Sequence, residues 1–416
     1  MVAMNIRITL KRIQGRKPKR KWNLEKLAKS GNFADQLENE MTRETPTAVE
    51  ERWTALKEKI LKTAEDQIGY QNKKTPKKPW ITQEMIQAMD ERRKWKHQTT
   101  EKAKKEYRRL NNELRRKTDK AREEWWSEQC SELERLLREG KEDLVYKRVK
   151  HLGRDHNKSH ETNIRDKEGQ LLTESKEVMK RWHDYIEELY NKKGKPKQLD
   201  MEEQQQSTTD IGPDLLQEEI QEAINELKNG KAEGADGIPA EILKNLGEHA
   251  TKELIGICQE IYVTGIWPED FLQSLIVPIE KKRNATNCED YRTISLLSHA
   301  SKIMLKVVHR RLEGRMETLH FLGEDQYEFR RGKGTREAIG ALRVISERSI
   351  EHGNDLYICF VDYEKAFDRV DWTKLMNTLK RLGVDWRDRQ LITNLYMGQS
   401  FSIRINGEKS EEGIIG

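Results

Sequence analysis

Residues 356–372, LYICFVDYEKAFDRVDW, hold the pattern that decides the fold of the second half of the chain. An apolar run from Leu356 to Val361 leads directly to Asp362, and a stretch that favours a helix follows. Such a run predicts a buried strand with Asp362 at its carboxyl end. A carboxylate held there is a rigid ligand for Mg²⁺ in phosphoryl transfer. The alternative is a structural carboxylate that caps the next helix.

Composition limits the class of protein. The 416 residues leave room for two or three domains. Charged residues make up 36% of the chain, and no apolar run approaches the length of a membrane span. Four widely separated cysteines without a CxxC motif are typical of a reduced intracellular protein, and no secretory signal is visible. We therefore expect a nuclear or cytoplasmic protein without a membrane segment.

The first half of the chain is basic, and apolar residues at three- and four-residue spacing predict helices over 22–70 and from Thr82 to about His151. Within 71–120, 17 Lys and Arg stand against 7 Asp and Glu. This excess favours contact with a nucleic-acid backbone, and the alternative is a solvated helix face. The cations proposed for this contact are Arg92, Arg93, Lys94, Lys104, Lys105, Arg108, Arg109, Arg115 and Arg116.

Composition shifts divide the chain into four predicted segments. Residues 1–71 form a basic tail with a helical segment, and 72–160 form long basic amphipathic helices. Residues 161–213 hold two short strands, a helix and a polar linker, and 214–416 form a mixed α/β domain. Within that domain the patterns predict a strand at Leu275–Ile279, a helix over 295–316 and a hairpin that turns at Asn406–Gly407.

Four blocks in the second half resemble, in order, the reverse transcriptase of LINE-type (non-LTR) retrotransposons. They are GKAEGADGIPAEILK (230–244), the stretch 267–313 with YRTISL, DQYEFRRGKGTREAIGALRVISE (325–347) and YICFVDYEKAFDRVDW (357–372). The resemblance implies an α/β (α+β) right-hand polymerase with fingers and a partial palm, preceded by a mostly α-helical basic region. It also implies addition of dNTPs to a primer 3′-hydroxyl on an RNA template, with a DNA primer or target as the further partner.

The resemblance assigns roles to single residues. Asp362 becomes a catalytic ligand of Mg²⁺ in a two-metal site. Phe367 matches the aromatic residue that selects dNTPs, although a core aromatic is the alternative. Lys281, Lys282 and Arg292 lie where cations reach the incoming triphosphate, with solvated surface charge as the alternative for each. The block that contacts the template supplies Gln326, Arg330 and Thr335.

Two departures from the family pattern weigh against activity. Glu328 stands where the family has a glycine before Phe329, and no Asp–Asp pair occurs in the sequence. The family's RQG and YADD blocks are not found before Gly416. We therefore expect a catalytically incomplete fragment of an RNA-directed DNA polymerase, so whether the chain is an enzyme stays open. The alternative is a non-catalytic RNA- or DNA-binding protein derived from a mobile element.

Overall fold

A computed structural model describes residues 21–29, 32–41, 46–71, 78–96, 98, 100–152, 164–190, 211–282, 285–330, 332–363 and 365–415. The chain divides into two compact units: a main unit, made of 1–70 and 162–416, and a helical unit, 71–161. The predicted basic tail up to residue 20 and most of the predicted polar linker, 191–210, lie outside the described residues. In the part of the chain that is described, no helix combines the length and apolar character needed to cross a bilayer.

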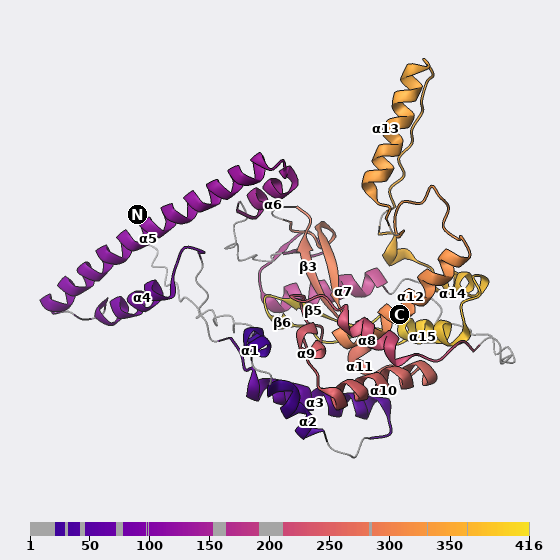
Figure 1. Ribbon diagram of the computed structural model, residues 1–416, viewed down its shortest axis with the longest axis horizontal. Coiled ribbons are helices and arrows are strands. Elements are labelled where there is room, and N and C mark those ends of the chain that lie inside the picture. The colour runs from indigo at the N-terminus through magenta and orange to yellow at the C-terminus, as the bar shows by residue number, and fades with distance from the viewer. Residues whose placement is uncertain are drawn as a thin grey trace, which may run out of the picture. The chain divides into compact units, whose positions relative to one another are not determined.

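The helical unit consists of α4 (Gln83–Lys96), α5 (Glu101–Arg138) and α6 (Glu142–Leu152) (Figure 1). Threonine side chains cap the first two helices: the Thr82 hydroxyl accepts from the Met85 N–H, and the Thr100 hydroxyl accepts from the Ala103 N–H. Gly140, at a φ of +69°, ends α5. The one or two long helices predicted from Thr82 to about His151 are thus three helices, of which α4 and α6 both pack on α5.

Three N-terminal helices belong to the core of the main unit. These are α1 (Leu24–Lys29), α2 (Asn32–Glu40) and α3 (Val49–Gln67), and both α2 and α3 pack on α10 (Glu248–Thr264). Trp53 of α3 is fully buried, and its ring meets Phe271 edge-on at 4.8 Å between centroids. Residues from both ends of this unit therefore share one hydrophobic core.

Ion pairs reinforce the same contact. Arg52 on α3 donates to Glu253 at 2.8 Å and to Glu260 at 2.5 Å, both on α10. The Asp270 carboxylate accepts from the Trp53 indole at 2.9 Å and from Lys57 Nζ at 2.5 Å. These charges are partly buried, so their hydrogen bonds fix the direction of α3 as well as contributing stability.

The sheet is built around β3 (Gln273–Glu280), which contains the predicted strand at Leu275–Ile279. β3 pairs antiparallel with β4 (Tyr291–Leu296) and parallel with β5 (Ser400–Ile405). β6 (Glu408–Lys409) and β7 (Gly413–Ile414) both pair antiparallel with β5. Asn406 and Gly407 form the β5–β6 turn with φ values of +53° and +89°, the backbone that a two-residue hairpin favours. The predicted hairpin is confirmed.

A second core lies between this sheet and α7 (Ser175–Tyr190), which packs on β5. Trp182 and Ile186 of α7 are fully buried together with Phe401 of β5. The two short strands predicted upstream are also present, as β1 (Ile164–Arg165) and β2 (Leu171–Leu172). Mixed helices and strands confirm the expected α+β class for this unit.

The remaining elements include one difference from the sequence prediction. The helix predicted over 295–316 is α12 (His299–Thr318), because the residues up to Leu296 belong to β4. The other helices are α8 (Gln217–Asn225), α9 (Ala240–Lys244), α11 (Glu269–Leu272), α13 (Thr335–Glu351), α14 (Trp372–Arg381) and α15 (Trp386–Met397), with short 3₁₀ turns η1 (Cys288–Asp290) and η2 (Phe367–Arg369).

The strand predicted at Leu356–Val361 is wrong. Residues 354–363 have no regular secondary structure, and Tyr357 and Phe360 are 90% and 81% exposed. A strand is stabilised by hydrogen bonds to a neighbouring strand. Both edges of β3 are already paired, with β4 and β5, and the run pairs with no strand of the described chain. Asp362 therefore follows an exposed segment without regular secondary structure rather than a buried strand.

The glycine-rich loop before α9 encloses a buried carboxylate. Gly234 lies so close to α12 that a Cβ atom there would be 2.5 Å from the Ser298 nitrogen. Asp236 is 5% exposed, and its Oδ2 has no hydrogen-bond partner within the described chain. Burial raises the pKa of Asp236 from 3.8 to about 7, although the hydrogen bond that its carboxylate accepts from the Ile238 N–H acts in the opposite direction.

This raised pKa predicts a pH-dependent stability. An acid whose pKa is higher in the folded state stabilises the fold below its unfolded pKa, and that stability is lost as the pH rises through about 7. We expect the unfolding free energy to fall by on the order of 2 to 3 kcal/mol between about pH 5 and 8, and Asp236→Asn to remove this fall. Urea unfolding of the full chain at both pH values measures it. Asp355→Asn, at an exposed position, is the control, and an unchanged pH dependence in Asp236→Asn would contradict the assignment.

Candidate functional site

Asp362, the proposed metal ligand, is exposed, and the structure gives it no neighbouring carboxylate cluster. Nowhere in the described chain do three or more His, Cys, Asp or Glu side chains gather in a way that could hold a metal ion. A two-metal site needs carboxylates around both ions. The described donors therefore do not fit a resident two-metal centre. Asp371, in contrast, caps α14, since its carboxylate accepts from the Lys374 N–H at 2.9 Å, as expected for a helix-start residue.

Phe367 lies on η2 and is 81% exposed, so the alternative of a core aromatic is wrong. Its ring meets Phe329 edge-on, with 6.4 Å between the centroids. Phe329 has a φ of +59°, which is uncommon for a bulky side chain and marks a constrained loop. The contact brings the block at 325–347 next to the block at 357–372, so two of the predicted site regions meet.

The three cations proposed to bind the triphosphate differ in the hydrogen bonds and ion pairs that they already form. Lys281, just after β3, donates to the Glu289 carbonyl at 2.8 Å, and Lys282 pairs with the Asp290 carboxylate at 2.9 Å. Arg292 lies opposite Ile279 in the β3–β4 register and is exposed. Its guanidinium has no hydrogen bond or ion pair with a described residue. Arg292 is thus the cation of this group that remains available to a ligand.

Two of the proposed template residues, Gln326 and Arg330, lie in a loop that folds on itself. Arg330 donates to the Gly323 carbonyl at 2.8 Å, and Gln326 donates to the Glu328 carbonyl at 3.4 Å. Thr335 is the first residue of α13, which has no buried residue. Phe329 and Arg330 also line a cavity of about 450 Å³ against α12. No pattern in the sequence predicts this cavity, because none links the loop to that helix.

The nine proposed nucleic-acid cations of the helical unit fall into two groups. Five have partners in the structure: Arg92 bonds to Asn111, Arg93 to Asp90, Lys104 to Glu101, Arg109 to Glu106 and Arg115 to Asp119. The other four have no hydrogen bond or ion pair from their side chains to a described residue, and they are Lys94, Lys105, Arg108 and Arg116.

Three of these unpaired cations form a stripe on α5. Lys105, Arg108 and Arg116 follow one another at steps of three and eight residues, so they lie on one side of the helix. The buried residues Ala103 and Leu114 face the other way, toward the packed side. At 1.5 Å per residue the stripe is about 16 Å long. We refer to these three residues as the α5 stripe.

Comparison with known proteins decides the family of part of the main unit. The model of the family described as reverse transcriptase (RNA-dependent DNA polymerase) matches residues 279–414. This matched stretch is similar to reverse transcriptases, and we refer to it as the reverse transcriptase segment. This reverse transcriptase segment contains Asp362, Phe367 and the other proposed nucleotide and template residues. The helical unit lies outside the match.

Curated relatives agree with the family model. The chain is 27% identical over 194 residues to the RNA-directed DNA polymerase from mobile element jockey of Drosophila funebris, a stretch that is 46% of this chain and 21% of the relative. It is 32% identical over 169 residues to a probable RNA-directed DNA polymerase from transposon BS of Drosophila melanogaster, which is 40% of this chain and 18% of the relative. The matched stretch thus spans about a fifth of these relatives.

The exposed apolar run within the reverse transcriptase segment predicts self-association. Tyr357, Phe360 and Val361 are 90%, 81% and 73% exposed, on backbone that is free to pair with another chain. We expect the double substitution Tyr357→Ser/Phe360→Ser to lower the fraction of large species severalfold in sedimentation velocity at rising protein concentration. Ile266→Ser, which removes an apolar side chain that is 61% exposed elsewhere, is the control. Equal effects of the two changes would contradict the prediction.

Proposed function

We propose that the chain is part of an RNA-directed DNA polymerase of a non-LTR retrotransposon, with residues 214–416 as fingers and partial palm. The observation that carries this proposal is the family match over 279–414, which includes the block around Asp362. The Phe329–Phe367 contact supports it, because it joins the proposed template block to the proposed nucleotide block. The substrates of this function are an RNA template, a DNA primer or target, and dNTPs.

Arg292 and Phe367 are the side chains best suited to handle a nucleotide. An unpaired guanidinium donates paired hydrogen bonds to phosphate oxygens. An exposed aromatic ring five residues beyond Asp362 offers a flat apolar surface to a sugar or a base. Lys281 and Lys282 would have to give up their present partners to take part. We therefore assign the triphosphate to Arg292 before either lysine.

We assign no part of the nucleotide-addition step to the described residues. The family uses divalent metal ions, but Asp362 is a single exposed carboxylate with no companions for a two-metal centre. Of the polymerase function, these residues can perform the binding of template and nucleotide.

A second candidate is a non-catalytic nucleic-acid-binding protein derived from a mobile element. The α5 stripe favours it, because these unpaired cations lie outside the reverse transcriptase segment and need no polymerase site to act. In either function the helical unit at 72–160 would contact the phosphate backbone. The two functions differ in whether a recessed primer end is recognised.

The first test compares ligands on the full chain. We expect binding to a poly(rA)/oligo(dT) hybrid with a recessed 3′ end to be at least fivefold tighter than binding to blunt double-stranded RNA, measured by fluorescence anisotropy. Equal affinities would favour the binding-only alternative. On the same preparations we expect no dNTP incorporation with Mg²⁺. Incorporation that is lost in Asp362→Ala and kept in Asp355→Ala would contradict our assignment and place the chemical step in this chain.

The second test addresses the α5 stripe. Each phosphate contact contributes about 1 to the slope of log affinity against log salt. We expect Arg108→Gln/Arg116→Gln to lower that slope by about 2 and to weaken RNA binding about tenfold at low salt. Arg93→Gln/Lys104→Gln removes the same charge from residues that are already ion-paired, and we expect a smaller loss. Equal losses would show that net charge alone matters and would overturn the assignment of the stripe.

A further inference from the structure

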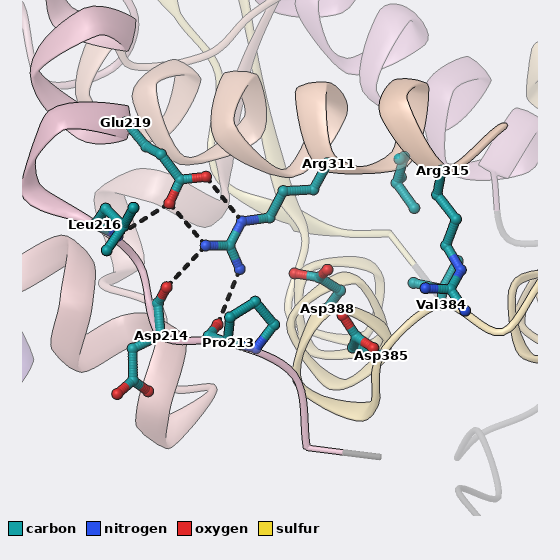
Figure 2. A pocket seen from close by; sticks show the side chains of 10 residues that line it. Pro213, Asp214, Leu216, Glu219, Arg311, Arg315, Val384, Asp385 and Asp388 are labelled. Atoms are coloured by element: carbon teal, nitrogen blue, oxygen red, sulfur yellow. Dashed lines mark hydrogen bonds and ion pairs between the residues drawn. The ribbon is translucent and has the colours of Figure 1, made fainter. Parts of the chain in front are cut away.

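A cavity of about 470 Å³ lies in the main unit between the stretch before α8, the last turns of α12 and the start of α15 (Figure 2). Its volume is in the range of pockets that take small organic ligands. Leu216, Leu312, Val384 and Pro213 give it apolar walls. The remaining lining is charged, so the chemistry of a ligand depends on which charges are already matched.

Arg311 closes one side of the cavity and has no donor left for a ligand. A guanidinium has five N–H groups. Nε and Nη2 donate to the two Glu219 carboxylate oxygens at 3.1 and 2.7 Å, and Nη2 also donates to the Asp214 carbonyl at 2.9 Å. Nη1 donates to the Pro213 carbonyl and to the Tyr262 hydroxyl, both at 3.0 Å. Arg311 therefore serves as a fixed wall and not as a receptor for an anion.

Two carboxylates of the lining remain unmatched after these pairs. Glu219 is neutralised by Arg311, and the Asp214 carboxylate pairs with Arg387. Asp385 and Asp388 are three residues apart at the first turn of α15, and they face the cavity together (Figure 2). Neither forms an ion pair with a cation of the described chain.

Asp388 is the more unusual of the two. Its side chain is 3% exposed, and its Oδ1 has no hydrogen-bond partner in the described chain. A buried acceptor without a donor costs free energy. Burial raises the pKa of Asp388, and Arg311 together with the hydrogen bond to Tyr262 offsets this only in part. Arg315, the other arginine of the lining, donates its Nε to the Leu382 carbonyl at 2.9 Å and has no carboxylate partner in the described chain, so the unmatched charges of the lining are two carboxylates and one guanidinium.

We propose that this cavity binds an ammonium or guanidinium group carried on an aliphatic stem. Asp388 accepts the hydrogen bond of the cation, Asp385 adds a second negative charge, and the stem packs on Leu312 and Val384. This chemistry comes from two sources, a free alkyl cation or a lysine or arginine side chain of a peptide. The inference does not depend on the proposed polymerase function, since Asp385 and Asp388 lie outside the four blocks that resemble the polymerase.

The experiment is a calorimetric titration of the full chain with agmatine in one arm and with Nα-acetyl-arginine amide in the other. We expect saturable binding in at least one arm, and at least a tenfold loss of affinity in Asp388→Asn. Glu187→Gln, which removes one negative charge from an exposed position on α7, leaves the affinity unchanged. Asp385→Asn, at the rim, gives a smaller loss and serves as the second variant if Asp388→Asn fails to fold.

Proton release provides an independent readout. A bound cation favours the charged carboxylate of Asp388, so binding releases protons at any pH where the free protein holds this carboxyl protonated, and the measured heat then depends on the ionisation enthalpy of the buffer. Binding in the agmatine arm alone assigns a free cation, and binding in the acetyl-arginine amide arm assigns a side chain of a peptide. No binding in either arm, or binding that neither Asp388→Asn nor Asp385→Asn weakens, would overturn the proposal.

Discussion

The packing of α3 against α10 and α11 is the contact on which the rest of the main unit depends. Trp53 is buried against Phe271, and its indole shares the Asp270 carboxylate with Lys57. Because one carboxylate accepts from two side chains of α3, the start of α11 is fixed to that helix. β3 begins at Gln273, directly after α11, so its direction follows from this contact. The helices at 24–67 therefore help to orient the sheet that carries the reverse transcriptase segment.

The sheet in turn determines where the nucleotide residues can lie. β3 uses one edge for β4 and the other for β5, so Arg292 is held in register on β4 while no edge of β3 is left for the apolar run at 356–361. The same pairing that fixes one proposed nucleotide residue therefore leaves Asp362 on exposed backbone. This explains how the family match and a donor set that does not fit two metal ions occur in one chain.

Local patterns predicted the elements that local forces form. The apolar spacing of Trp182, Tyr185 and Ile186 predicts α7, and the Asn406–Gly407 pair predicts its turn, because both depend on neighbouring residues. The run at 356–361 has the composition of a strand. A strand also needs a neighbouring strand to pair with, and composition alone does not predict which strand that is. The cavity lined by Arg311 and Glu219 could not be predicted either. These two residues are 92 positions apart, and the sequence alone indicates a solvated charge on a helix for each of them.

The proposed ligand-binding residues lie mostly in a part of the chain that contributes no buried residue to the core. No described residue between 309 and 371 is buried, and this stretch contains both the proposed template block and Asp362. Surfaces that bind ligands are commonly drawn from the least stabilised parts of a protein. Since the core contributes little to this stretch, the template binding that we propose would add contacts that stabilise it. Affinity for the proposed template and the local stability of this stretch would then be linked.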